Sequence, residues 1–244
     1  MTRVFADLHL RLSGKDISQI QKLASKMADL GYTLVGVPLA PDARTEEIHR
    51  LKATFEDVGL DFASRVDLYP RSQDELLNLL RKLRRRFEVI CVCCESKEVA
   101  RQAAKDRRVD LLNFPLLDYR RRFFDRAEAE LASTGCAAFE VDVKPVLVLE
   151  GPSRVRFLSC LRREIMVALD FDQGVVVSSG VSEMLLLRKP REVALLASLF
   201  GLEGLGALDA VSKNPAQIVC RNREKLGSGF VAPGIRLVKQ GVGC

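Results

Sequence analysis

Residues 33–68 decide the fold, and they read TLVGVPLAPDARTEEIHRLKATFEDVGLDFASRVDL. Apolar runs of strand length stand at 33–39 and 61–68. Between them, residues 45–58 carry apolar side chains at spacings of three and four, the pattern of an amphipathic helix. Nearly continuous apolar strands are typical of parallel sheets covered on both faces, and Gly59 gives a helix stop signal. The stretch therefore predicts a strand, a helix and a second, parallel strand.

The same alternation extends over most of the chain. Seven strands are expected, over Val4–Leu8, Thr33–Leu39, Asp61–Leu68, Phe87–Cys93, Val109–Phe114, Ala137–Val143 and Gly174–Val177. Six helices are expected, over Ile17–Leu30, Thr45–Val58, Gln73–Arg86, Lys97–Lys105, Phe123–Ala132 and Ser153–Leu169. Strands that alternate with helices in this way indicate an α/β fold with a parallel sheet.

The pattern becomes mostly helical after the seventh strand. Pro190 and Pro215 stand where each can occupy a first helical turn, and Asn214 is a candidate N-cap for a helix over 215–225. We predict a (β/α) TIM-like barrel that is incomplete or distorted in its last unit, with extra C-terminal helices. Residues 1–244 are expected to form this barrel as a single domain. An open doubly wound sheet is the alternative.

The amino-acid composition indicates a globular protein. Of the 244 residues, 48% are hydrophobic and 29% are charged, which is enough apolar surface to close a core. No apolar run approaches the length of a membrane span, and the first residues lack the apolar region of a signal peptide. The seven cysteines show no paired spacing. We expect a soluble cytoplasmic protein without a disulfide framework and without a membrane partner.

The first strand carries the first candidate site. Asp7 and His9 alternate with apolar residues, so both are expected to point into the barrel near its C-terminal mouth, where barrel enzymes hold catalytic groups. The segment 7–11 resembles the opening motif of the polymerase-and-histidinol-phosphatase (PHP) family of metal-dependent phosphoesterases, but Arg11 replaces its second histidine. The other histidine is His49, in a predicted helix, so a cluster of several imidazole ligands is not available. We expect a buried His9 held by Asp7, with a stand-alone metal-dependent phosphoesterase of the PHP type as the alternative.

Two further motifs have structural interpretations. Cys91, Cys93 and Cys94 lie on a predicted strand, where 91 and 93 face one way and 94 the other, so we expect core cysteines and no zinc site. The strand end Ser178-Ser179-Gly180 can bind phosphate or can form a plain turn. A sugar-phosphate enzyme that uses these three residues is the weakest interpretation, because the chain has no nucleophile elbow, dinucleotide motif or Walker loop.

Basic residues gather in the middle of the chain. The formal net charge is +6, and residues 81–126 alone hold 14 basic and 7 acidic side chains. Arg84-Arg85-Arg86 closes a predicted helix, where cations are favoured without any ligand. Arginines that alternate with aromatic residues suit RNA, and one cluster is flanked by Tyr119, Phe123 and Phe124. The candidate RNA-binding residues are Arg107, Arg108, Arg120, Arg121, Arg122, Arg188 and Arg191.

The order of several segments carries a second resemblance. The opening strand 4–11 and the segment 109–115 are followed by Ser-Ser-Gly at 178–180, Arg-Lys-Pro-Arg at 188–191 and Arg-Asn at 221–222. Together they resemble the thirty-kilodalton protein subunit of ribonuclease P, in its archaeal form. The spacing from Ser-Ser-Gly to Arg-Lys-Pro-Arg is the specific part of the match.

This resemblance implies a barrel related to the PHP barrels in a protein that is not itself the nuclease. In the family, the RNA does the chemistry and holds the magnesium, so no catalytic residue, metal or cofactor is expected in this chain. The family subunit pairs with a small ferredoxin-like protein subunit and helps the catalytic RNA to remove the 5′ leader of precursor tRNA. We therefore expect a subunit that binds the ribonuclease P RNA and this protein partner, and contacts precursor tRNA only indirectly.

Overall fold

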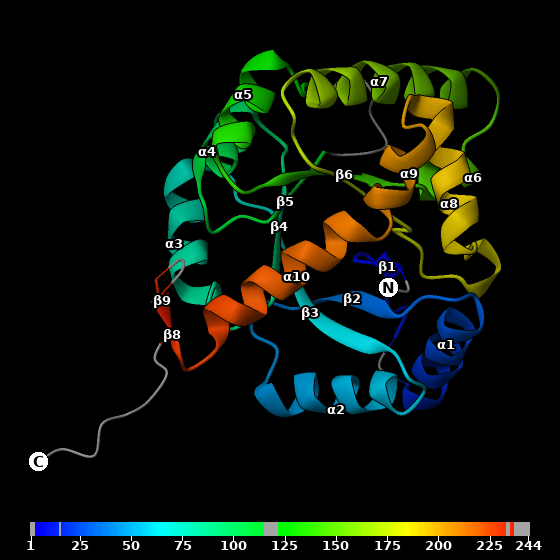
Figure 1. Ribbon diagram of the computed structural model, residues 1–244, viewed down its shortest axis with the longest axis vertical. Helices are drawn as coiled ribbons and strands as arrows, with labels where there is room; N and C mark the ends of the chain where they lie inside the picture. The colour runs from blue at the N-terminus through cyan, green and yellow to red at the C-terminus, as the bar shows by residue number, and fades with distance from the viewer. Residues whose placement is uncertain (1–2, 15, 115–121, 233–234, 237–244) are drawn as a thin grey trace, which may run out of the picture.

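Seven parallel strands form the centre of the molecule. The computed structural model describes residues 3–14, 16–114, 122–232 and 235–236. The strands are β1 (Ala6–Asp7), β2 (Leu34–Leu39), β3 (Asp61–Leu68), β4 (Val89–Cys93), β5 (Leu111–Asn113), β6 (Ala138–Asp142) and β7 (Val175–Ser178). Each pairs in parallel with the next along the chain, in the order β1 to β7 (Figure 1).

The sheet curls until its first and last strands meet. Just past both strands, the Gly180 N–H donates to the His9 carbonyl at 3.0 Å and the Arg11 N–H donates to the Val181 carbonyl at 2.9 Å. A doubly wound sheet would reverse its strand order at a switch point, whereas this order is strictly sequential. The predicted TIM-like barrel is therefore confirmed and the doubly wound alternative is wrong.

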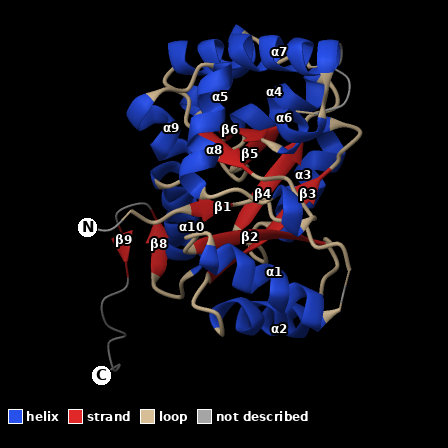
Figure 2. Ribbon diagram, turned by 90° about the vertical axis from the view of Figure 1, so that its right-hand side faces the viewer, coloured by secondary structure: helices blue, strands red, loops and turns tan. Residues whose placement is uncertain are grey.

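Helices surround the barrel, as Figure 2 shows from the side. They are α1 (Ile17–Asp29), α2 (Thr45–Glu56), α3 (Gln73–Leu83), α4 (Lys97–Lys105), α5 (Arg126–Thr134), α6 (Lys144–Val148), α7 (Gly151–Asp170), α8 (Pro190–Ala197), α9 (Gly204–Ala210) and α10 (Lys213–Leu226). Gly59 follows α2 with φ of +80°, a conformation that glycine adopts without strain. The sequence prediction missed α6, and it also missed a short antiparallel pair, β8 (Phe230–Ala232) and β9 (Ile235–Arg236). Of the helices that the structure describes, none is both long and apolar enough to cross a membrane.

Helix α10 closes the end of the barrel where the strands begin (Figure 1). Its Ile218 and Val219 join the apolar cluster inside the barrel. Arg223 forms an ion pair with Asp61 at the start of β3, and Asn222 donates to the Asp110 carboxylate just before β5. The C-terminal helices thus seal the N-terminal end, which leaves the opposite end as the place for a site.

The predicted start of α10 needs a correction. The helix begins at Lys213 after Ser212, two residues earlier than a cap at Asn214 would allow. Asn214 lies inside the first turn, and its side-chain amide donates to the Val175 carbonyl at 2.7 Å. This residue therefore joins α10 to β7 and does not cap the helix. Pro190 and Pro215 do lie in first turns, as predicted.

Candidate functional site

Charged side chains fill the C-terminal end of the barrel. Along a strand, alternate residues face the same side, so in β3 Arg65 and Asp67 follow the interior residue Ala63, and in β6 Glu140 and Asp142 follow the interior residue Ala138. Three of these side chains and three neighbours are buried: Arg65, Glu140, Asp142, Asn113, Ser178 and His9. This arrangement places an ionic network where barrel enzymes carry their active sites.

Arg65 is the centre of the network. Its side chain is 0% exposed, and its Nη1 and Nη2 donate to the two carboxylate oxygens of Glu140 at 2.6 and 2.7 Å. Its Nε donates to Asp67 at 2.6 Å, and Nη1 also donates to the Leu8 carbonyl at 2.9 Å. Burial lowers the pKa of the guanidinium, but Asp67 and Glu140 outweigh burial and raise it, so Arg65 keeps its charge.

His9 lies beside this ion pair, between two carboxylates. Its Nδ1 hydrogen-bonds with Asp142 at 2.8 Å, and its Nε2 lies 3.3 Å from Asp67 and 2.9 Å from Arg11 Nε. A neutral ring accepts from Arg11 at Nε2, whereas a protonated ring donates from Nε2 to Asp67. Burial and Arg65 lower the pKa of His9, but the carboxylates outweigh them and raise it to about 10, which favours the protonated ring.

The prediction that Asp7 holds His9 inside the barrel is wrong in one respect. Ala6 of β1 and Leu8 just after it enter the interior cluster, so Asp7 between them faces away from it. Its Oδ1 accepts from the backbone N–H groups of His9 and Ser179 at 3.0 and 2.9 Å. His9 is buried as predicted, but its imidazole is paired with Asp142 and Asp67.

A pocket of about 310 Å³ opens above the network. Its polar lining includes Arg11 and Lys144 beside Tyr69, with Asn113 and Asp142 below. The sequence motifs pointed to Arg11 only as the residue in place of a motif histidine, and they did not point to Arg65, Asp67, Glu140 or Asp142. The available signal was a pair of charged residues two positions apart inside an otherwise apolar strand, which occurs in both β3 and β6.

The strand end at 178–180 is turned inward. Ser178 donates its hydroxyl to Glu140 at 2.8 Å, and Gly180 donates its N–H to the His9 carbonyl. The Ser179 N–H donates to Asp7. These donors are therefore engaged within the protein, which removes the basis for the sugar-phosphate interpretation.

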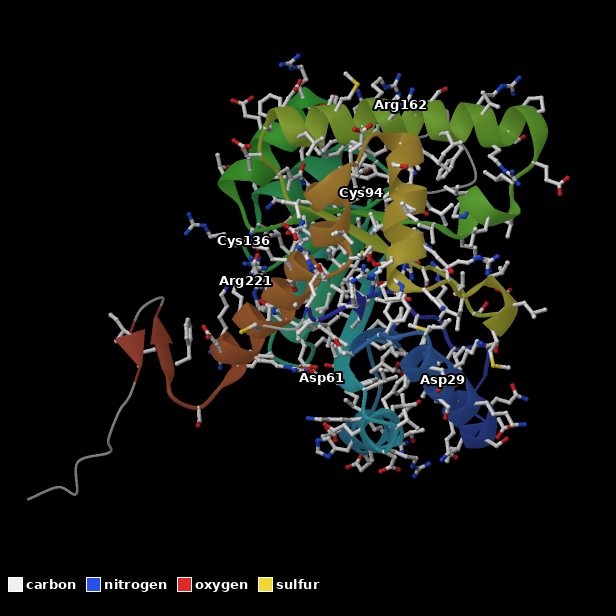
Figure 3. The ribbon with its side chains drawn as sticks, turned by 45° about the vertical axis from the view of Figure 1, so that its right-hand side comes forward. Asp29, Asp61, Cys94, Cys136, Arg162 and Arg221 are labelled. Carbon is white, nitrogen blue, oxygen red and sulfur yellow. The ribbon has the colours of Figure 1, made fainter. Side chains whose placement is uncertain are left out.

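The cysteines behave as core residues. Cys91 lies in the interior cluster and Cys94 packs in the outer core between β4 and the helices (Figure 3), so the two face opposite sides as predicted. All three cysteines of the run are buried and carry free thiols. The thiol of Cys91 donates to Glu140 at 3.5 Å.

The arginine cluster at 120–122 needs a correction at its described member. Tyr119, Arg120 and Arg121 lie outside the described residues. Arg122 is buried and pairs with Glu164 through Nε and Nη2, so its guanidinium is not available to an anion. We remove Arg122 from the candidate RNA-binding residues.

The aromatic neighbours of this cluster also belong to the core. Phe124 stacks on Phe139 with ring centroids 4.5 Å apart, and Phe123 meets Phe114 edge to face. Helix α5 accordingly begins at Arg126, later than predicted. Phe123 and Phe124 are therefore not free to stack on RNA bases.

The arginines of the remaining basic clusters differ in how many hydrogen bonds and ion pairs they form within the protein. Arg84 donates to Asp110 and to three backbone carbonyls, so it is a structural residue. Arg108 forms a two-pronged pair with Asp106 at 2.9 and 2.6 Å. Arg188 donates to the Leu185 and Leu187 carbonyls. Arg107 and Arg191 are exposed.

The fold defines a class of protein, the (β/α) barrels. Histidinol phosphate phosphatase from Lactococcus lactis, solved with zinc, L-histidinol and phosphate, matches with a TM-score of 0.50 at 10% identity, over 82% of this chain and 93% of its own. A chain in the cryo-EM structure of archaeal ribonuclease P with mature tRNA matches more closely. Its TM-score is 0.83 at 21% identity, over 95% of this chain and 98% of that chain.

Sequence comparison then gives the family. The model of the ribonuclease P subunit p30 family matches residues 4–226. Ribonuclease P protein component 3 of Methanosarcina barkeri is 31% identical over 222 residues, which cover 91% of this chain and 90% of that protein. The chain belongs to the ribonuclease P subunit p30 family, as its motifs predicted, and is therefore a protein subunit of ribonuclease P.

Proposed function

We propose that this subunit is not catalytic by itself and supports ribonuclease P by binding its RNA and a small ferredoxin-like protein subunit. The observation that carries the proposal is the barrel mouth, where Arg65 is paired with Glu140 at the position in which barrel enzymes hold catalytic groups. The mouth is thus built as a closed ionic network. We propose no metal or cofactor for this chain and assign the magnesium to the RNA.

The RNA contacts are assigned to arginines of the basic clusters. The candidates are Arg107 and Arg108 between α4 and β5, Arg188 and Arg191 at the start of α8, and Arg120 and Arg121. Among the described candidates, Arg107 and Arg191 are exposed, whereas Arg108 and Arg188 are partly buried, so Arg107 and Arg191 take the leading role. By neutralising phosphates, these side chains reduce the magnesium that the folded RNA requires, and precursor tRNA is affected through the RNA.

A salt titration of binding to the ribonuclease P RNA tests this assignment. Each arginine that neutralises a phosphate contributes roughly 0.7 to 0.9 to the slope of log affinity against log salt. The variants Arg107→Ala/Arg108→Ala and Arg188→Ala/Arg191→Ala are compared with a control pair, Arg44→Ala/Arg50→Ala, which removes two exposed arginines near α2. We expect the slope of log affinity against log salt to be flatter than that of the parent protein in at least one test pair and unchanged in the control pair. Slopes that match the control in both test pairs would contradict the assignment.

Exposed apolar side chains favour a protein partner on another surface. Leu195 of α8 is 72% exposed and Leu205 of α9 is 71% exposed. The two helices lie side by side (Figure 1), and α7 carries a further exposed apolar residue, Met166. Apolar side chains grouped on a surface are typical of protein interfaces. We assign this surface, which we call the α8–α9 surface, to the small ferredoxin-like subunit.

Binding of the purified partner subunit tests the α8–α9 surface. Leu195→Glu and Leu205→Glu are expected to weaken the complex, since each places a charge in an apolar contact. Ile17→Glu, at a half-exposed position on α1, is the matched control. Reconstituted cleavage of precursor tRNA over a range of magnesium concentrations then measures the consequence. Unchanged partner affinity in both variants would assign the partner to another surface.

A further inference from the structure

A buried guanidinium stands where the barrel's potential metal ligands converge. The ligand atoms of His9, Glu140 and Asp142 lie within 4.8 Å of one another, and all three residues are buried. An imidazole and two carboxylates are the ligand types that zinc and related ions take in proteins. The four N–H···O contacts of Arg65 in this place, to Glu140, Asp67 and the Leu8 carbonyl, are 2.6 to 2.9 Å long.

Arg65 supplies the positive charge at the centre of the cluster. Its guanidinium lies against the carboxylates of Asp67 and Glu140, with contacts of 2.6 Å to each. Arg11 adds a second cation at the rim, with its Nε 2.9 Å from His9 Nε2. A divalent ion among the same ligands would meet the guanidinium at close range in a site shielded from water, where repulsion between charges is strong.

Hydrogen-bond donors of the protein surround the Glu140 carboxylate. Arg65 takes both of its oxygens, while Ser178 donates to Oε1 at 2.8 Å and Asn113 donates to Oε2 at 3.0 Å. The carboxylate therefore has its acceptor sites filled by donors of the protein. The residues present do not fit a divalent ion as long as Arg65 remains.

We propose that the Arg65 guanidinium is the resident cation of this barrel, in the place of a divalent metal, and that His9, Glu140 and Asp142 become a metal site once it is removed. Arg65 binds the end of β1 through Leu8 and joins β3 to β6, as a bound ion would through its ligands. The metal-dependent fold neighbour and this chain then differ in the cation that organises the mouth. The inference concerns metal content alone and stands independently of RNA or partner binding.

Metal binding by Arg65→Ala tests the proposal. All proteins carry His49→Ala, because His49 is exposed on α2 and is the other imidazole of the chain. After loading with Co²⁺ and gel filtration, elemental analysis gives the metal content, and visible absorption of Co²⁺ reports its coordination. We expect about one Co²⁺ for each Arg65→Ala chain and a melting temperature that rises with Co²⁺, since an ion that binds the folded state stabilises it.

Two matched variants locate the effect. Arg65→Lys keeps the positive charge and is expected to retain no metal, like the parent protein. Arg65→Ala/Glu140→Gln lacks a carboxylate ligand and is expected to lose the Co²⁺ that Arg65→Ala binds.

Three results would overturn the proposal. The parent protein could retain stoichiometric metal with Arg65 present, or a folded Arg65→Ala chain could bind none. An Arg65→Ala chain that remains unfolded with Co²⁺ would also contradict it, because the ion would then fail to replace the guanidinium.

Discussion

Arg122 can have a structural role or an RNA-binding role, and its replacement by alanine distinguishes the two. The side chain lies between α7 and the core: Nε donates to both oxygens of Glu164 at 3.1 and 3.0 Å, and Nη1 donates to the Phe114 carbonyl at 3.4 Å. Its guanidinium also lies over the Phe157 ring, 5.4 Å from the ring centroid. The exposed fraction of the side chain is 1% for Arg122 and 0% for Glu164.

The expected cost follows from this burial. Arg122→Ala leaves the Glu164 carboxylate buried without its cation, and removal of one partner of a buried ion pair typically destabilises a protein by about 3–5 kcal/mol. Replacement of both partners by apolar residues, Arg122→Met with Glu164→Leu, removes the uncompensated charge and should cost much less. We therefore expect a strong, favourable coupling between the two sites.

Urea unfolding measures the free energy of unfolding of these variants. Arg162→Ala is the matched control, because Arg162 is an exposed residue of α7 (Figure 3) and an exposed charge contributes little. The same proteins are then titrated with salt while bound to ribonuclease P RNA. A free energy of unfolding in Arg122→Ala equal to that of the control, together with a flatter salt slope, would refute the structural role and return Arg122 to the RNA surface.

Three further predictions concern buried groups. His9→Ala should lower the free energy of unfolding by about 1–3 kcal/mol, because Asp142 loses its partner, and should preserve holoenzyme activity; lost activity at an unchanged melting temperature would contradict this. Burial and Asp125 raise the pKa of Glu128 to about 7, so the folded state favours the neutral acid and the native protein loses stability as pH rises from about 4.5 to about 7. Glu128→Gln should remove that loss, which is worth about 1–3 kcal/mol by pH 8. Urea unfolding at pH 4.5 and pH 8 measures the free energy of unfolding of the parent protein and of Glu128→Gln. An equal change with pH in the two proteins would contradict the prediction. Gly180→Ala should lower the melting temperature, because its Cβ would lie 2.7 Å from the Asp142 carboxyl carbon at a φ of +65°, whereas Gly14→Ala meets open space and should not.

The local pattern of apolar residues was sufficient to predict the repeating strand–helix units of the barrel. The apolar runs at 33–39 and 61–68 and the helix between them were predicted because periodicity and glycine stop signals depend on residues near one another in the chain. Helix α6 has only five residues, too short for a periodic pattern to develop. The start of α5 was misplaced because Phe123 and Phe124 resemble helix residues in sequence, while the aromatic cluster with Phe114 and Phe139 holds them outside the helix.

The sequence by itself determined the class of fold, the family and the burial of His9 and the cysteines, because these follow from spacing along one chain. The tertiary structure decided which charges meet. Arg65 and Glu140 are 75 positions apart, and Arg122 and Glu164 are 42 apart, so neither pair has a sequence signature. A cluster of arginines in sequence forms a charged surface only if the fold leaves it exposed, and the packing of Arg122 against Glu164 of α7 buries this member of its cluster.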